Sequence, residues 1–318
     1  AYDLENLLSP TLAALLLTWA GFYQLFYLNS LTFLLSAILI TFTLLPKSAA
    51  HDRPLQIWHN IQFGISAYLR TPRLRALWAL YFVVAAAGGM VIVNTVVYVQ
   101  GHLQLGQQTL ALVLMASGAG SMVAALWVPY LLRYFNERSI MLTGGLLLGL
   151  VLTLGTRMLP LAGVYLLWFG IGLGSSLIQT PAGNLLRRSC RPSDSAAFFA
   201  ANFSLSHLGW LVGYLLAGWL GSELGLSWAF AVLAGMAWVG LLIAWQQYPK
   251  QDQEVLWHTH AAMDHAHPHQ HDQHHDHMHH HQHASTDQHI HKHQHSPLRH
   301  KHPFVIDQHH PRWPDKEG

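Results

Sequence analysis

Histidine is concentrated near the C-terminal end of this chain. Of its 25 histidines, four precede Trp257, and the remaining 21 lie between His258 and His310. Imidazole is the commonest protein ligand for borderline transition metals, and it binds in the neutral form that dominates above its unperturbed pKa of about 6.5. The composition of this segment therefore predicts a metal-binding tail.

The spacing of the histidines indicates the kind of metal site. Closed structural zinc sites use four fixed ligands, usually with cysteines at C-x₂₋₄-C spacing, whereas this tail has no cysteine and offers overlapping H-x-H steps. We therefore expect several interchangeable sites that bind Ni(II), and also Co(II), Zn(II) or Cu(II), with no resident cofactor required. The candidate ligands are His265, His267, His269, His271, His274, His275, His277, His279, His280, His281, His283, His289, His291, His293 and His295.

Two other interpretations of the tail stay open. It could be a solvated linker whose histidines have no role, or a polyelectrolyte that gains positive charge between about pH 7 and pH 5. A purification tag fits poorly, because the histidines are interleaved with Asp, Gln, Pro and Lys, and the chain runs on to Gly318.

The rest of the chain is apolar enough to be embedded in a membrane. Runs such as 74–99, 110–132 and 161–178 approach or exceed the roughly 20 apolar residues that span a bilayer as a helix. The one cysteine, Cys190, excludes a disulfide framework. The chain opens on an acidic segment without a signal peptide, and we expect it to be a C-terminal fragment.

The pattern predicts eight spanning helices and one long basic connection. Residues 47–75 carry five Lys or Arg residues against Asp52 alone, and Trp58, Ile61, Ile65 and Tyr68 recur there at helical spacing, which indicates an amphipathic helix on the membrane surface. Lys and Arg mark alternate loops, so the tail is predicted to be cytoplasmic. The expected helices cover residues 4–20, 25–45, 74–99, 109–132, 139–155, 161–180, 196–220 and 228–245.

Polar residues within the spans are the candidates for a transport path, because such residues are costly in lipid unless they face a cavity or a partner. The alternative for each is a hydrogen bond between helices. Pro181, with Gly183 and Asn184, is expected to end or kink its helix. The path candidates are His207, Asn202, Ser206, Asn94, Gln179, Thr180, Asp3 and Glu5.

The layout of two helices, a long basic connection and six more helices resembles the last eight helices of a major facilitator superfamily transporter. Residues 3–10, Gly21-Phe22 and residues 28–33 look like helices five and six of its exporter-like branch, and residues 63–75 look like the entry to helix seven. With the histidine-rich end, the pattern resembles the nickel-resistance permeases of that superfamily. The resemblance implies an all-α integral membrane bundle, incomplete at its N-terminus, with a disordered tail.

The resemblance also divides the chain and suggests its activity. Residues 1–46 would end the N-terminal half, 47–75 would form the cytoplasmic linker, 76–248 the six-helix C-terminal half, and 249–318 the tail. We expect a monomeric secondary transporter of the bacterial inner membrane that exports nickel, with cobalt as the second candidate, by proton antiport. The alternative is an exporter of drugs or siderophores with a metal-sensing tail. No enzyme motif or nucleic-acid-binding feature occurs.

Overall fold

The computed structural model describes residues 21–43, 57–250, 252, 255–260, 263–269, 289–295 and 298–306, together with Leu16 and Trp313. Contacts divide the chain into two units, residues 1–252 and residues 253–318, which we describe separately. The predicted helix over residues 4–20 lies outside the described residues, apart from Leu16, which is helical.

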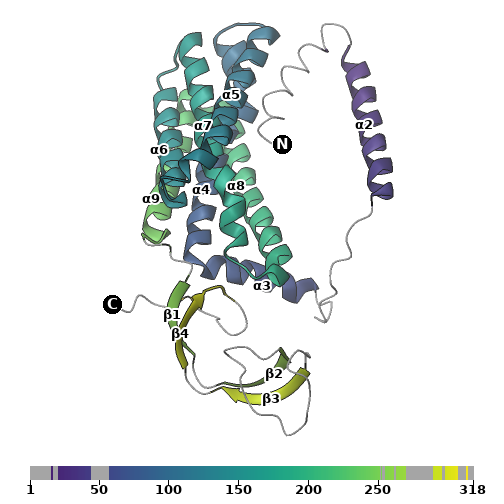
Figure 1. Ribbon diagram of the computed structural model, residues 1–318. Helices are drawn as coiled ribbons and strands as arrows, with labels where there is room; N and C mark the ends of the chain where they lie inside the picture. The colour runs from purple at the N-terminus through teal and green to yellow at the C-terminus, as the bar shows by residue number, and fades with distance from the viewer. Residues whose placement is uncertain are drawn as a thin grey trace. The chain divides into compact units, whose positions relative to one another are not determined.

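The described part of the first unit is helical throughout, as predicted (Figure 1). Seven of its helical segments are long and apolar enough to cross a membrane. The elements are α2 (Phe22–Phe42), α3 (Ile57–Arg70), α4 (Pro72–Gly89), the π-helical segments η1 (Met90–Asn94) and η2 (Val97–His102), α5 (Gln107–Leu131), α6 (Glu137–Gly155), α7 (Leu161–Arg187), the 3₁₀ turn η3 (Pro192–Asp194), α8 (Ser195–Glu223) and α9 (Leu226–Gln247).

Local sequence explains where these helices begin and end. Pro72 opens α4 at a position where its missing N–H costs nothing. The Asn136 side chain caps α6 by accepting a hydrogen bond of 2.8 Å from the Ser139 backbone N–H. Gly225 separates α8 from α9 with φ of 88°, a conformation that glycine adopts without strain.

Pro181 was expected to end or kink its helix; it does not end it, because α7 continues through this residue to Arg187. Proline is tolerated inside spanning helices where neighbouring helices and Ser or Thr side chains satisfy the freed backbone groups. Pro181 is buried in the bundle, and the hydroxyls of Ser176 and Thr180 lie 3.1 Å apart in the preceding turn. Packing therefore holds the helix together across the proline.

The helix predicted over residues 74–99 changes its hydrogen bonding partway along. It is α-helical to Gly89 and then passes through η1 and η2. Such π-helical turns widen a helix locally and are frequent at functional sites. Asn94, one of the path candidates, is the last residue of η1.

Small residues set the close approach of the helices. α7 packs against α5 and α6, and α4 packs against α8 and α9. A Cβ atom added at Gly144 would lie 2.7 Å from the Gly174 carbonyl oxygen, and one added at Gly213 would lie 2.6 Å from the Ala85 carbonyl oxygen. Backbones this close need glycine, which is how helices pack where lipid supplies no hydrophobic drive.

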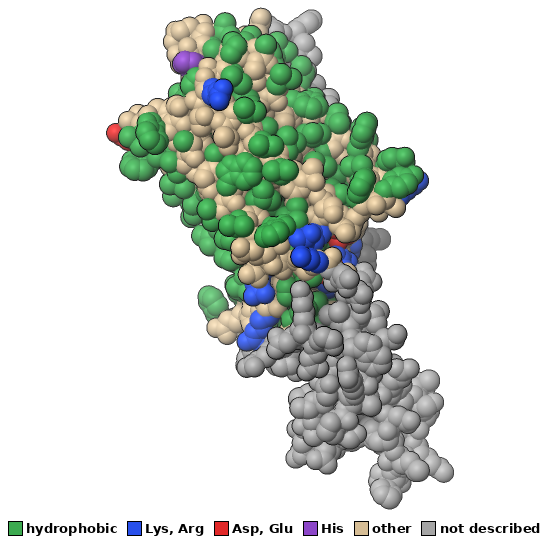
Figure 2. Space-filling view, turned by 90° about the vertical axis from the view of Figure 1, so that its left-hand side faces the viewer, with side chains coloured by type: hydrophobic (Ala, Val, Ile, Leu, Met, Phe, Trp, Pro, Cys, Tyr) green, Lys and Arg blue, Asp and Glu red, His purple; other side chains and the backbone are tan. Residues whose placement is uncertain are grey.

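The outer flank of the bundle is apolar. Figure 2 shows hydrophobic side chains over the face that carries α6 and α9, with most of its Lys and Arg side chains gathered toward one end. At that end α3 lies, α4 and α6 begin, and α7 and α9 end; we call it the α3 end (Figure 1).

In the residues that the structure describes, the second unit contains antiparallel strand pairs at positions where a disordered tail was expected. β1 (Val255–His260) pairs with β4 (Leu298–Pro303), and β2 (Met263–His269) pairs with β3 (His289–His295). The physical reason is visible in the sequence, because histidine at every second position has the period of a β-strand.

Candidate functional site

Asn202 on α8 links three helices at the α3 end. The Tyr68 hydroxyl on α3 donates a hydrogen bond of 3.0 Å to Asn202 Oδ1, and the Tyr81 side chain on α4 also hydrogen-bonds to Asn202. Tyr68 is fully buried, and burial, followed by the influence of Tyr81, raises the pKa of its hydroxyl well above its ordinary value. The phenol therefore stays protonated and keeps donating to Asn202.

His207 and Ser206 make local contacts on the same helix. His207 Nδ1 lies 2.8 Å from the Phe203 carbonyl oxygen, and its ring lies over the Phe203 ring with centroids 3.8 Å apart. Ser206 Oγ donates to the same carbonyl at 2.9 Å. The imidazole is exposed, and Nε2 is the ring nitrogen left free to contact a ligand.

Asn94 is buried and joins two helices. Its Nδ2 donates a hydrogen bond of 2.9 Å to the Ala217 carbonyl oxygen on α8. A Cβ atom added at Gly221 would lie 2.6 Å from Asn94 Oδ1, so α8 approaches this side chain closely. These contacts are those of the interhelical alternative stated for Asn94.

The other path candidates are not brought together with His207. Gln179 and Thr180 lie on α7, where both are half-buried and Thr180 Oγ1 contacts Ser176 Oγ. Asp3 and Glu5 lie outside the described residues. Among the described residues there is no group of three or more His, Cys, Asp or Glu side chains arranged to hold a metal ion.

An ion-pair network that sequence reasoning missed lies at the α3 end. The Arg73 guanidinium, whose side chain is 1% exposed, donates to Ser189 Oγ at 2.8 Å and to the Arg188 carbonyl oxygen at 3.0 Å, and pairs with Asp252 at 3.3 Å. Arg188 pairs with Glu137 at 2.6 Å and also with Asp252. We call Arg73, Arg188, Glu137 and Asp252 the charge network; it joins the ends of α4, α6, α7 and α9.

The pKa values of the two arginines of the charge network are shifted in opposite directions. Burial lowers the pKa of the Arg73 guanidinium, and the carboxylate of Asp252 offsets this only in part. Burial lowers the pKa of the Arg188 guanidinium, but the carboxylates of Asp252 and Glu137 outweigh burial and raise that pKa above its ordinary value. Burial, together with the same two carboxylates, raises the pKa of the neighbouring Tyr248 hydroxyl, which stays neutral. The ion pairs of the network therefore connect the ends of α4, α6, α7 and α9.

The strand register of the second unit aligns the predicted metal ligands. In the β2–β3 pair, His265 lies opposite His293, His267 opposite His291, and His269 opposite His289. Because every second position along a strand belongs to the same face, the register assigns the seven histidine positions of β2 and β3 to one face of the pair. His271 to His283 lie outside the described residues.

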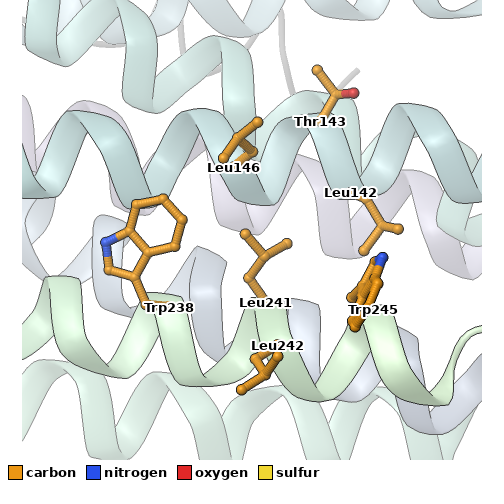
Figure 3. Close-up of a pocket in the computed structure, with 7 residues that line it drawn as sticks. All are labelled: Leu142, Thr143, Leu146, Trp238, Leu241, Leu242 and Trp245. Carbon is orange, nitrogen blue, oxygen red and sulfur yellow. The ribbon is translucent and has the colours of Figure 1, made fainter.

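An apolar groove of about 370 Å³ runs between α6 and α9 (Figure 3). Leu142, Thr143 and Leu146 line it from α6, and Trp238, Leu241, Leu242 and Trp245 line it from α9. The Trp238 indole N–H donates to Thr153 Oγ1 at 3.0 Å, which satisfies its polar group. The groove thus presents almost only hydrocarbon to the surrounding lipid.

The fold and these features define a class of protein. Long apolar helices that are packed through glycine and carry ion pairs at one end make this a multi-pass integral membrane protein. The Major Facilitator Superfamily model matches residues 4–152 and, in a second, overlapping match, residues 77–268. The chain therefore belongs to the Major Facilitator Superfamily, and it is a secondary transporter rather than an enzyme. No curated protein matches the chain.

Proposed function

We propose that this transporter exports divalent transition-metal ions, nickel foremost and cobalt second, from the cytoplasm, and that its histidine-rich unit binds the same ions. The observation that carries the proposal is the β2–β3 register, which sets three histidine pairs directly opposite one another. Residues opposite each other in an antiparallel pair have Cβ atoms about 4.5–5.5 Å apart, a spacing from which two imidazoles can reach one ion. Neutral imidazole suits nickel, cobalt, zinc and cupric ions.

The charge distribution supports a cytoplasmic location for the histidine-rich unit. Among residues 57–250, Arg157 is the only Lys or Arg at the end of the bundle opposite the α3 end. The positive-inside rule then assigns the α3 end, from which the chain continues into the second unit, to the cytoplasm. Because this unit is joined to the transporter by the chain itself, the metal that it binds has a raised effective concentration for the transporter. Proton antiport is the proposed driving force, and the membrane is the bacterial inner membrane.

The experiment that tests the proposal measures metal content and growth of cells that carry the full-length gene. Under nickel, cobalt, zinc and copper challenge, expression should selectively lower cellular nickel and raise nickel tolerance. Unchanged metal content together with altered sensitivity to organic toxins would instead favour export of organic compounds. Loss of nickel export when a protonophore collapses the proton gradient would support antiport, and export that persists would contradict it.

A matched pair of variants tests the role of the strand register. Replacing His265, His267 and His269 with asparagine removes one partner from each opposed pair. Replacing Asp264, Lys292 and Gln294 with alanine changes the same strands on the other face. Nickel bound by the purified protein at pH 7.5 should fall only in the first variant, and equal binding by both would contradict the assignment.

A further inference from the structure

A second apolar groove, of about 520 Å³, lies between α4 and α9 and differs from the first by carrying a charge at one end. Trp78, Ala79 and Phe82 line it from α4, with Leu69 from the end of α3. The α9 wall consists of Gly235, Met236, Val239, Gly240, Ile243 and Gln247. Arg75, in the first turn of α4, and Gln247, the last residue of α9, bring the only strongly polar side chains to its lining, both at the α3 end.

Two glycines of α9 shape this groove: one allows α9 to approach α4, and the other leaves space at the far end. A Cβ atom added at Gly240 would lie 2.9 Å from the Ala79 carbonyl oxygen, so α9 and α4 are in close contact at that level. At Gly235 an added Cβ atom would meet nothing within 4 Å, so the far end of the groove is empty space that a larger residue would fill. The floor of the groove is therefore formed by backbone atoms, and the groove is deep because Gly235 and Gly240 have no side chains.

The dimensions of the groove fit one hydrocarbon chain. From Gly235 to Gln247 the α9 wall rises about 18 Å, at about 1.5 Å per residue. This length is close to the hydrocarbon thickness of one leaflet, which is about 15 Å. The lining is apolar over this length except at the α3 end, as the environment of an acyl chain requires. The length and polarity of the groove therefore suit one acyl chain of a lipid.

Arg75 supplies the matching polar contact. Its side chain is exposed, and unlike Arg73 it has no hydrogen bond or ion pair with any residue that the structure describes. A guanidinium at the membrane–water boundary, directly above an apolar groove, is complementary to a phosphate joined to a fatty chain. Half-buried Gln247 adds a neutral hydrogen-bonding group at the same end.

We propose that the groove between α4 and α9 is a phospholipid site, in which one acyl chain lies between the helices and the lipid phosphate binds Arg75, with a preference for anionic phospholipids. The α6–α9 groove, whose lining includes no charged residue, has no such preference. An interaction of about 1 kcal/mol for one arginine near an anionic lipid surface corresponds to about a fivefold preference. Because α4 and α9 form the walls, an occupied site braces these two helices together.

The test uses the full chain, purified in detergent and titrated with phosphatidylglycerol or phosphatidylcholine carrying brominated acyl chains, which quench nearby tryptophan fluorescence. Phosphatidylglycerol should quench more strongly, and a distinct part of the quenching should disappear in Trp78→Phe. Arg75→Gln should weaken phosphatidylglycerol binding about fivefold. The matched control Arg133→Gln removes another exposed arginine that does not line the groove and should change nothing.

Filling the groove provides the second arm of the test. Gly235→Leu and Ile243→Phe add bulk inside the groove and should abolish the quenching that depends on Trp78, whereas Leu146→Phe adds bulk to the α6–α9 groove and should leave it intact. Each variant is first checked for an unchanged elution volume and thermal midpoint, and either filling variant alone suffices. Equal binding of the two lipids, or an Arg75→Gln variant that behaves like Arg133→Gln, would overturn the proposal.

Discussion

Asp252 offers the sharpest test of what stabilises the bundle. It follows α9 and is the last residue of the first unit, and its carboxylate contacts both Arg73 and Arg188. Asp252→Asn keeps the shape of the side chain and removes its charge. We expect this single change to lower the thermal stability of the bundle markedly.

The size of the stability loss depends on the hydrogen bonds that Arg73 keeps after Asp252 is replaced. Its side chain is 1% exposed, so water cannot replace the lost carboxylate, and the positive charge of Arg188 lies close by. Removing one partner of a buried ion pair costs about 3–5 kcal/mol. We expect the lower end, about 3 kcal/mol, because Arg73 still donates to Ser189 and to the Arg188 carbonyl oxygen. For a unit of this size the loss corresponds to a fall in Tm of about 6–12 °C.

The assay is thermal unfolding of the purified protein in a fixed detergent, with Glu223→Gln as the control. Glu223 is an exposed acid at the end of α8, and its neutralisation should leave Tm unchanged. Glu137→Gln should cost less than Asp252→Asn, because its partner Arg188 is 20% exposed and keeps Asp252. Adding Arg73→Met to Asp252→Asn should restore part of the lost stability, because it removes the buried guanidinium that has lost its carboxylate partner. A Tm for Asp252→Asn within 2 °C of the parent would refute the reasoning.

Three further outcomes are expected. Gly213→Val forces side-chain atoms against the Ala85 backbone and should lower Tm by several degrees, whereas Gly235→Ala, at an open position, should not; equal effects would contradict the packing argument. Cys190 is buried, and burial raises the pKa of its thiol, so maleimide labelling of the native protein at pH 7.5 should be slow and should accelerate with rising pH; fast labelling at pH 7 would contradict this. Asn94→Ala removes the hydrogen bond to the Ala217 carbonyl and should cost about 0.6–1.7 kcal/mol, read as a small fall in Tm; a loss of transport with an unchanged Tm would instead assign Asn94 to the transport path.

The membrane helices were predictable because a bilayer imposes length and apolarity on each span separately. α6 begins at Glu137 and ends at Gly155, within two residues of the prediction, since a polar turn and a glycine mark its ends. The course of α7 past Pro181 was not predictable by the same reasoning, because whether a proline breaks a spanning helix depends on what packs around it. The change to π-helical hydrogen bonding after Gly89 likewise has no local signal in a uniformly apolar stretch.

The charge network could not be predicted from the sequence for a different reason. Arg73 was visible in the sequence as one of several basic residues of a connecting loop, and Asp252 as one acid before the histidines. Their pairing spans 179 positions and depends on α4 beginning where α9 ends, which only the assembled bundle provides. In the second unit, by contrast, the local sequence pattern did contain the signal. The alternation of histidine was visible, and a period of two is that of a strand, yet disorder was expected because the family resemblance implied it.

Some polar residues of the bundle join separate helices and others do not, and this difference affects how the bundle can move. Alternating access in this superfamily relies on one half rocking against the other as a largely rigid body. Asn94, Asn202 and the charge network each join separate helices within this bundle, so they serve that rigidity. Among the described residues, His207 and Gln179 make no side-chain hydrogen bond or ion pair to another helix, and His207 keeps one imidazole nitrogen available. Substitutions at Asn94, Asn202 or the charge network should therefore mainly lower the stability of the protein. Substitutions at His207 or Gln179 are expected to change which cargo is transported.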